Sequence, residues 1–427
     1  MLNTYKIFIM KNISLSTLTH RLASLASICF IFLVIFSLAG CKKDGDNTPV
    51  ENKYLESSEI IDSYSSGFIK AILGTQSTEF PEINPIISST AYGVDIYRIT
   101  YKTTFHNAEV TASGLVCIPS SEGEFPVISF QNGTNTSHYN APSVNPNELM
   151  YSLMEAMAGN GYIVVIADYL GFGESQSMIH PYYDKESTTG SVVDMILAAK
   201  ELLNDGQVKA KSSGKYFLMG YSQGGWATLT TLQKCEQSYS TEINVAAASC
   251  GAGAYDLMAM SDHVLALQTF PGPLYLPYFI YSRIDAGDMP GPLTQFFKEP
   301  YASRIPGLFD GTHSNDEVNA QLNDTIAKLV TDEMINSFST SADFVTLRSL
   351  LMANSASAWN CDAVIRFYHG TADQNVPPNQ SDIIYNRFIS MGVSPSKVTL
   401  LPMEGLTHGT GLVPWGISTI NWFNQLK

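Results

Sequence analysis

The sequence predicts an α/β fold, with a mostly parallel central sheet covered by helices on both faces. Stretches with the periodicity of strands alternate with stretches with the periodicity of helices along most of the 427 residues. Several expected strands are continuous apolar runs, such as residues 162–167, which is typical of strands buried on both faces. One long segment, between residues 250 and 364, interrupts this alternation. Together these observations indicate a layered sheet that carries an inserted cap.

The composition indicates a folded chain with a large core and an acidic surface. Apolar residues make up 45% of the chain and charged residues 15%, and the formal net charge is −15. A body this acidic repels nucleic acid and anionic lipid head groups, and no run of lysine and arginine opposes that repulsion. We therefore expect a neutral substrate and no nucleic-acid partner. No CxxC motif or Cys/His cluster suggests a metal site, and we expect no cofactor.

The first 40 residues have the features of a secretion signal. Basic residues precede an apolar run at residues 28–38, which has the length of a signal-peptide core and is short for a membrane span. The run ends in Leu38-Ala39-Gly40-Cys41, which resembles a lipoprotein signal in which the Cys41 thiol accepts the lipid. We therefore expect a lipoprotein signal peptide at 1–40 and a flexible tether at 41–53. The protein would then be exported and anchored to a bacterial membrane through Cys41, on the periplasmic side or at the cell surface.

Strands and helices are expected in alternation through the rest of the chain. The strands are expected at residues 94–101, 108–118, 126–131, 162–167, 215–220, 243–250, 364–369 and 397–402. The helices are expected at residues 147–159, 187–204, 224–236, 379–391 and 412–425. The first two strands show more polar and apolar alternation and predict an antiparallel hairpin at one edge of the sheet.

The segment 256–350 is expected to be the cap. It is rich in aromatic residues separated by prolines, and helical patterns follow at 316–337. A loop of this length without structure of its own would be unusual in a compact domain. We expect residues 54–255 and 351–427 to form the two parts of the α/β core, with the cap over the carboxyl ends of its strands.

The strongest functional motif is Gly220-Tyr221-Ser222-Gln223-Gly224, between an expected strand and an expected helix. In this context the motif predicts a nucleophile elbow, a sharp turn that exposes a serine hydroxyl above a helix N-terminus. The strained serine backbone requires neighbours without side chains, which Gly220 and Gly224 provide, and Gly225 permits close packing of helix on sheet. The motif therefore predicts Ser222 as a nucleophile.

Two polar loops after later strands offer partners for Ser222. Asp373 follows the strand 364–369, and His408 follows the strand 397–402. Since parallel strands end at the same edge of a sheet, we expect the nucleophile, the acid and the base along one rim. In this arrangement His408 acts as the base, and Asp373 orients its imidazole.

Other histidines and acids suit these roles less well. His369 lies within a strand and is expected to shape the turn before Asp373 through hydrogen bonds. The histidines in loops or in the cap are expected to be solvated, with His138 or His180 lining the pocket as an alternative. Asp362 precedes its strand, at the wrong end of the sheet. Asp168 is expected to support the fold near the elbow.

An oxyanion hole requires two backbone N–H groups that face the reacting carbonyl. One is expected from Gln223, at the start of the helix after Ser222. The second is expected from Thr134, in the loop after an early central strand, because Gly133 lets this loop approach the serine.

These motifs resemble those of the α/β-hydrolase superfamily, over about residues 90–427. The elbow, the acid loop His369-Gly370-Thr371-Ala372-Asp373 and the base loop Gly405-Leu406-Thr407-His408-Gly409 carry the resemblance. The long cap and the segment Gln131-Asn132-Gly133-Thr134 look most like the secretory lipases of lipase A type, and less closely like the prolyl-oligopeptidase-like esterases. The resemblance implies ester hydrolysis through an acyl-enzyme, with the cap forming much of the acyl pocket.

Hydrolysis of carboxylic esters is therefore the expected activity, on a small-molecule, lipid or glycan ester. The same residues also suit a peptidase acting on short peptides, or an enzyme that deacylates carbohydrate esters. A non-catalytic binding protein built on this scaffold is a further alternative. The sequence leaves open the oligomeric state and the pairing of the cysteines that remain after lipidation, which allow three disulfide arrangements. These cysteines are Cys117, Cys235, Cys250 and Cys361.

Overall fold

The computed structural model describes residues 52–427. The expected signal peptide at 1–40, the lipidation site Cys41 and nearly all of the tether at 41–53 lie outside these residues. No helix between residues 52 and 427 combines the length and the apolar character needed to cross a bilayer. In the same range, no three His, Cys, Asp or Glu side chains are grouped as a metal site would require.

Nine strands of the described residues form one sheet, in the order β1-β2-β3-β5-β4-β6-β7-β8-β9. The strands are β1 (Leu55–Tyr64), β2 (Val94–Phe105), β3 (Ala108–Pro119), β4 (Gly123–Gln131), β5 (Ile163–Ala167), β6 (Ala210–Tyr221), β7 (Val245–Gly251), β8 (Val364–Gly370) and β9 (Val398–Met403). Strands β1, β2, β3 and β5 pair antiparallel, and every other neighbouring pair is parallel. This sheet confirms the predicted fold class, and all eight expected strands are present.

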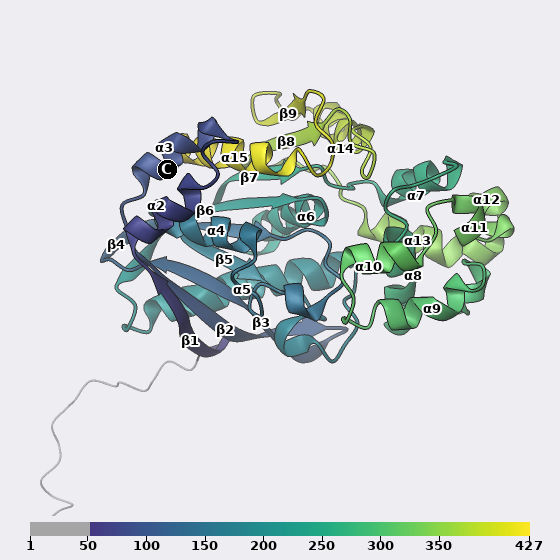
Figure 1. Cartoon of the computed structure of the whole chain (residues 1–427), viewed down its shortest axis with the longest axis horizontal. Helices are drawn as coiled ribbons and strands as arrows, with labels where there is room; N and C mark the ends of the chain where they lie inside the picture. The colour runs from purple at the N-terminus through teal and green to yellow at the C-terminus, as the bar shows by residue number, and fades with distance from the viewer. Residues whose placement is uncertain (1–51) are drawn as a thin grey trace, which may run out of the picture. The chain divides into compact units, whose positions relative to one another are not determined.

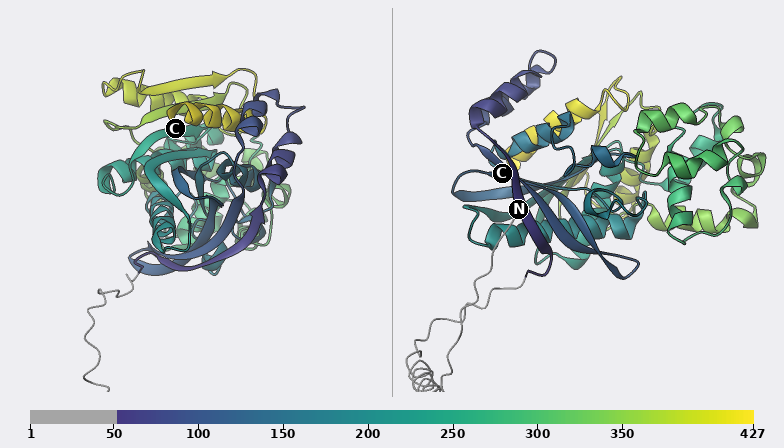
Figure 2. Two further views of the ribbon diagram at one scale, coloured as in Figure 1. Left: turned by 90° about the vertical axis from the view of Figure 1, so that its left-hand side faces the viewer. Right: turned by 60° about the horizontal axis from the view of Figure 1, so that its bottom comes forward.

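Helices cover both faces of the sheet (Figures 1 and 2). One face packs against α5 (Lys185–Asn204), α6 (Gln223–Ser238) and α14 (Asn379–Ser390). The other packs against α2 (Ser66–Gly74), α3 (Asn84–Ser89), α4 (Leu149–Ala158) and α15 (Leu412–Leu426). Alternate side chains of β5 point into the cores on the two faces of the sheet. Ile163 and Val165 enter the first core, whereas Val164 and Ile166 enter the second. Both faces of this strand are apolar because both are covered.

The edge strand β1 was not predicted from the sequence. It pairs antiparallel with β2, so that β2 and β3 form the expected hairpin but do not form the edge of the sheet. Most side chains of β1 are exposed, and its sequence Leu-Glu-Ser-Ser-Glu-Ile-Ile-Asp-Ser-Tyr has no apolar alternation. Its ladder also contains two irregularities of register. A polar, irregular edge strand carries little of the periodicity on which sequence reasoning depends.

A helical insertion fills the chain between β7 and β8. It comprises α7 (Leu257–Ala266), α8 (Tyr275–Asp285), α9 (Tyr301–Leu308), α10 (Asn315–Gln321), α11 (Ile326–Leu329), α12 (Asp332–Ser337) and α13 (Val345–Asn354). Figures 1 and 2 show these helices, in green, gathered at one end of the sheet. The apolar interior of the insertion includes Phe296, Phe344 and Met334 and is continuous with the core beneath α5 and α6.

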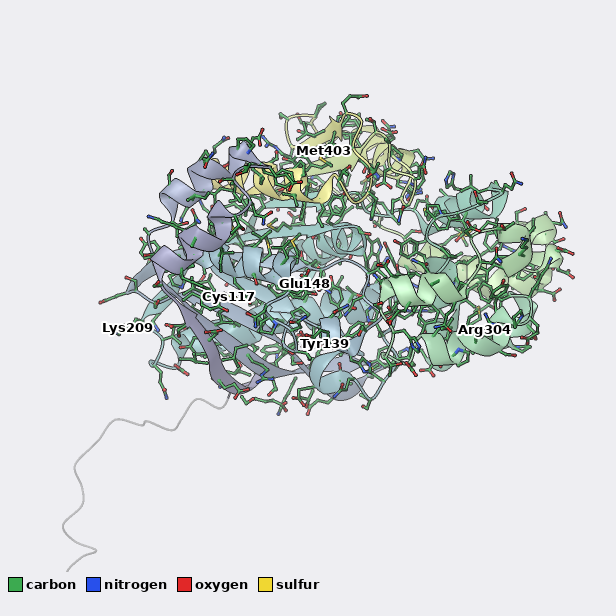
Figure 3. All side chains as sticks on the ribbon, viewed as in Figure 1. Cys117, Tyr139, Glu148, Lys209, Arg304 and Met403 are labelled. Carbon is green, nitrogen blue, oxygen red and sulfur yellow. The ribbon has the colours of Figure 1, made fainter. Side chains whose placement is uncertain are left out.

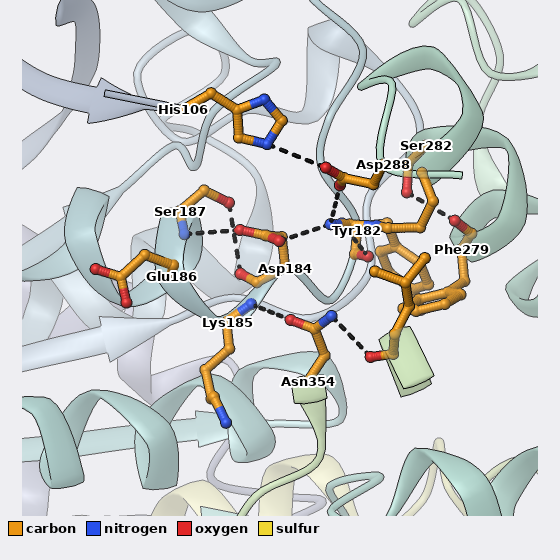
Figure 4. A network of polar contacts seen from close by, with 12 residues as sticks. His106, Tyr182, Asp184, Lys185, Glu186, Ser187, Phe279, Ser282, Asp288 and Asn354 are labelled. Atoms are coloured by element: carbon orange, nitrogen blue, oxygen red, sulfur yellow. Dashed lines mark hydrogen bonds and ion pairs between the residues drawn. The ribbon is translucent and has the colours of Figure 1, made fainter. Parts of the chain in front are cut away.

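A buried arginine joins the insertion to the sheet domain. Figure 4 labels its partners Tyr182, Asp184 and Asp288. Arg283, on α8, is fully buried, and one of its nitrogens lies 2.6 Å from Asp184 and 3.2 Å from Asp288. A second nitrogen donates to the Tyr182 carbonyl at 3.0 Å. Burial opposes ionisation of Asp184, but Arg283 and the hydrogen bond from Ser187 hold the pKa of Asp184 below its ordinary value. This pairing compensates the charge that α8 carries into the interior.

The four cysteines of residues 52–427 are free and buried. They are Cys117, Cys235, Cys250 and Cys361, of which Cys117 is labelled in Figure 3. Burial raises the pKa of each thiol. All four therefore act as small apolar residues of the core.

Candidate active site

The turn at Ser222 has the geometry of a nucleophile elbow. Ser222 joins the end of β6 to the start of α6 with a φ of 59°, a conformation that non-glycine residues rarely adopt. A Cβ at Gly224 would lie 1.9 Å from the Gln131 carbonyl oxygen, and a Cβ at Gly220 would lie 2.3 Å from the Gly224 carbonyl oxygen. The predicted need for glycine on both sides of Ser222 is therefore met by direct contacts between backbones.

A chain of hydrogen bonds connects Ser222, His408 and Asp373. The Ser222 Oγ lies 2.9 Å from His408 Nε2, and His408 Nδ1 lies 2.6 Å from Asp373 Oδ2. The three residues come from the ends of β6, β8 and β9, which are brought to one rim by the parallel order β6-β7-β8-β9. His408 is half-buried and Asp373 is buried, so the imidazole lies between a solvent-accessible hydroxyl and a shielded carboxylate.

The surroundings of Asp373 keep its carboxylate ionised. Burial opposes the charge, but hydrogen bonds from His369 and His408 outweigh it and lower the pKa of Asp373 to about 2. The backbone N–H groups of Asn375 and Val376 donate to its other oxygen, each at 2.9 Å. His369 also bonds to the Val376 carbonyl at 2.8 Å, which confirms its predicted role in shaping this turn.

Gln223, which follows Ser222, and Thr134, which lines the same pocket as Ser222, each carry a backbone N–H without an acceptor in the described part of the chain. Gln223 is the first residue of α6, where a backbone N–H has no partner in its own helix. A Cβ at Gly133 would lie 3.8 Å from the Ser222 Cβ, so the loop that carries Thr134 passes against the serine, as expected.

Comparison with known proteins assigns the chain to a family. Residues 148–410, which include Ser222, Asp373 and His408, match the family Hydrolase_4, described as serine aminopeptidase, S33. The chain belongs to this α/β-hydrolase family. No curated protein sequence matches it.

Solved structures of other hydrolases have the same fold as this α/β-hydrolase. A protein of Legionella pneumophila, provisionally assigned as a hydrolase, is 27% identical, with a TM-score of 0.77 over 87% of this chain and 98% of that one. The rice cell wall degrading esterase LipA of Xanthomonas oryzae is 23% identical, with a TM-score of 0.73 over 84% and 93%. Candida antarctica lipase A in its closed state is 18% identical, with a TM-score of 0.60 over 83% and 80%. Because LipA and lipase A are less than 25% identical to this chain, their likeness to it shows a shared fold and no more.

Two pockets of this hydrolase meet at Ser222. A narrow cavity of about 70 Å³ runs from the serine into the insertion and is lined by apolar side chains. They include Leu257, Val264, Phe270, Tyr275, Phe279 and Leu351. A wider pocket of about 510 Å³ also reaches the serine, and its lining includes polar groups. They include Asn135, Asn140, Glu148, Asn315 and His408, and Figure 3 labels Glu148.

The structure shows what two buried polar residues near the site do, Asp168 and His180. Asp168 is buried and accepts bonds from Ser113 and Ser143, which confirms it as a support of the fold. His180 is buried, so the expectation that it is solvated was wrong. Its Nδ1 donates to the Leu170 carbonyl, and its Nε2 accepts from the Gln223 side chain at 3.1 Å.

The environment of His180 keeps its ring neutral. Burial lowers the pKa of His180 to about 4. Its ring lies among the aromatic rings of Tyr169, Phe172, Tyr182 and Tyr278. The sequence around His180 contains tyrosines, but no local pattern places Gln223 against it, because the two residues are 43 positions apart.

Proposed function

We propose that this hydrolase cleaves carboxylic esters through an acyl-enzyme, with Ser222 as nucleophile, His408 as base and Asp373 as the acid that orients the base. The observation that carries the proposal is the hydrogen-bond chain from Ser222 through His408 to a buried carboxylate. The backbone N–H groups of Gln223 and Thr134, which have no acceptor among residues 52–427, support it. Each part of this arrangement corresponds to a step of acyl transfer.

The first step is attack on the ester carbonyl. His408 Nε2 accepts the Ser222 proton as Oγ bonds to the carbonyl carbon, and Asp373 stabilises the imidazolium through Nδ1–H. The carbonyl oxygen becomes an oxyanion, which Gln223 N–H and Thr134 N–H bind as an oxyanion hole. Such a donor typically contributes about 3 kcal/mol in the transition state.

The second step releases the alcohol and then the acid. His408 Nε2–H donates its proton to the departing alkoxide, which leaves an acyl group on Ser222. Water then attacks the acyl carbonyl as His408 accepts its proton, and Ser222 is regenerated with the carboxylic acid as product. The same two N–H groups bind the oxyanion in both steps.

The two pockets differ in lining, which favours an ester whose acyl group and alcohol differ in polarity. We place the acyl group in the narrow apolar cavity, whose walls come largely from the insertion, and the alcohol in the wider pocket, whose lining includes polar groups. In this proposal residues 256–350 form a cap, and the chain resembles lipases of the lipase A type in building its acyl site from the cap.

A second candidate is deacylation of carbohydrate esters. The amide of Asn140 and the carboxylate of Glu148 offer hydrogen-bond partners for a sugar in the wider pocket. The fold neighbour from Xanthomonas oryzae is described as a cell wall degrading esterase. Cleavage of short peptides is the remaining alternative that the triad chemistry permits.

Activity-based labelling and a substrate panel test these assignments. We expect a fluorophosphonate to label the wild type and not Ser222→Ala, and p-nitrophenyl ester hydrolysis to fall by about 10⁶-fold in that variant. Ser349→Ala, which changes an exposed serine on α13, is the matched control. Acetylated oligosaccharides and peptide amides, assayed in parallel, separate the three substrate classes. Labelling of Ser222→Ala at the wild-type rate would refute the proposed nucleophile.

We also propose that the mature protein begins at Cys41, carries lipid there and is held at a bacterial membrane on the periplasmic side or the cell surface. The sequence Leu38-Ala39-Gly40-Cys41 supports this proposal. Expression of Cys41→Ser in a Gram-negative host should move the protein from the membrane fraction to the soluble fraction. Retention of that variant in the membrane fraction would contradict lipid anchoring at Cys41.

A further inference from the structure

The loop that carries Thr134 is held by the insertion, through residues that lie about 180 positions away. The Asn315 Nδ2 group donates to the Thr134 carbonyl at 2.8 Å. The Thr136 hydroxyl lies 2.9 Å from Asn315 Oδ1 and 2.8 Å from the His313 carbonyl. A single side chain of α10 therefore contacts this loop both as donor and as acceptor.

Further bonds join the same two segments. His138 N–H donates to the Gly311 carbonyl at 2.8 Å, and Ser137 forms a β-bridge with Thr312. Tyr278, on α8, donates its hydroxyl proton to the Asn135 carbonyl at 3.1 Å. Figure 1 shows α10 on the side of the insertion that faces the strands.

The position of Asn315 follows from how α10 begins. Ser314 is its N-cap, and a capping box joins Ser314 to Glu317. Asn315 is consequently the first residue of the helix, half-buried against the loop rather than on the solvent side. The cap fixes the helix start, and the helix start directs the amide toward Thr134.

Thr134 is thereby held at two points. Its carbonyl is bound by Asn315, and its side-chain hydroxyl lies 2.7 Å from the Tyr182 hydroxyl. With the carbonyl and the side chain both fixed, rotation about the Thr134 backbone is restricted, and so is the direction of its N–H. That N–H is one of the two groups proposed above to bind the oxyanion.

We propose that Asn315 is a positioning residue for the oxyanion hole, which it orients from the insertion through the Thr134 carbonyl. The inference rests on the proposed function. It gives the insertion a part in transition-state stabilisation as well as in forming the acyl pocket. Since an oxyanion hole acts through preorganised donors, loss of this anchor should affect the transition state more than the ground state.

Kinetics of Asn315 variants on a small ester, p-nitrophenyl acetate, test this proposal. We expect Asn315→Ala to lower kcat about 10- to 100-fold, with KM changed less than about threefold. Asn315→Asp retains the acceptor for Thr136 but lacks the donor to Thr134, and we expect an equal or greater loss. The control is Asn336→Ala, which removes an exposed amide on α12 that donates to the Asp332 carbonyl of the same helix.

A transition-state mimic separates positioning from general damage to the fold. We expect a boronic acid that forms a tetrahedral adduct on Ser222 to bind Asn315→Ala more weakly, by the same factor as the loss of kcat. If Asn315→Ala does not fold, Thr136→Val removes one contact to the same amide and should give a smaller loss in the same direction.

The outcomes distinguish this proposal from the proposed function. Wild type that is neither labelled at Ser222 nor active on esters overturns both. Wild type that is labelled, together with folded Asn315 variants of unchanged kcat and boronic acid affinity, overturns the positioning role alone. Unchanged kcat in folded Thr136→Val would likewise overturn the positioning role alone.

Discussion

The backbone of Ser222 is held in a conformation that an isolated serine would avoid. Its positive φ costs on the order of 1–3 kcal/mol and persists only where surrounding packing imposes it. Here the imposing contacts are the approach of Gly224 to Gln131 and the hydrogen bond from Ser222 N–H to the Gly251 carbonyl. The accessibility of the hydroxyl therefore results from the close packing of β4, β6 and β7 around the start of α6.

Gly224→Ala should show how closely this turn is packed. The added methyl would meet the Gln131 carbonyl at 1.9 Å, so we expect the free energy of unfolding to fall by about 1–3 kcal/mol or more. Labelling of Ser222 should be lost or greatly slowed, because the turn must shift. Urea denaturation and fluorophosphonate labelling measure the two effects.

Gly190→Ala, within α5, is the matched control. A Cβ at Gly190 meets nothing within 4 Å, so the same substitution should stabilise the protein by about 0.5–1 kcal/mol. Wild-type stability and labelling in Gly224→Ala would show that the turn is less crowded than the structure indicates.

At the scale of elements, two sets of contacts between the insertion and the sheet domain lie close to the site. Arg283 of α8 binds Asp184, the N-cap of α5, and the Tyr182 carbonyl. Asn315 of α10 binds the loop after β4. Tyr182 belongs to both sets, since its carbonyl accepts from Arg283 and its hydroxyl contacts Thr134. The docking of the insertion and the geometry around Ser222 are therefore connected.

Replacement of Arg283 should weaken this docking. Arg283→Met leaves Asp184 without its buried partner, and we expect a loss of about 3–5 kcal/mol in the free energy of unfolding. KM for esters with longer acyl groups should rise, because Tyr182 and Tyr183 line the narrow cavity. Denaturation and a chain-length series measure these effects.

Arg304→Met on α9 provides the comparison for Arg283→Met. Arg304 is exposed, and within residues 52–427 it donates to the Gln321 carbonyl and lies over the Tyr301 ring, so we expect a change within about 0.5 kcal/mol. Equal effects of the two substitutions would argue against a special role of the buried pair.

Over the whole molecule, stability depends on two cores separated by one sheet. The core beneath α4 and α15 contains an uncompensated acid: Glu155 is buried, and neither of its oxygens has a hydrogen-bond partner among residues 52–427. Burial and, to a lesser extent, the charge of Asp62 raise the pKa of Glu155 to about 8. The folded protein therefore keeps a proton that the unfolded chain releases near its ordinary pKa of 4.5.

This acid should make stability fall as pH rises. Between about pH 4.5 and pH 8 this side chain binds fewer protons in the unfolded state than in the native state, so its contribution to the free energy of unfolding decreases with pH and levels off above pH 8. Glu155→Gln should remove about 3–5 kcal/mol of this decrease, measured by denaturation at pH 4.5, 6 and 8. Glu79→Gln, at an exposed position, should retain it. A pH dependence that is the same in Glu155→Gln would refute the assignment.

The sequence by itself determined the eight strands that have apolar runs or alternation, the elbow at Ser222, and the loops that hold Asp373 and His408. Each is a local sequence pattern. Because neighbouring parallel strands end at the same edge of the sheet, these patterns were sufficient to predict that the three loops lie together. Tertiary structure decided the pairing of the polar strand β1, the burial of His180 against Gln223, the docking of Arg283 and the bond from Asn315 to Thr134. These features depend on contacts between segments far apart in the chain, and no periodicity of the sequence records such contacts.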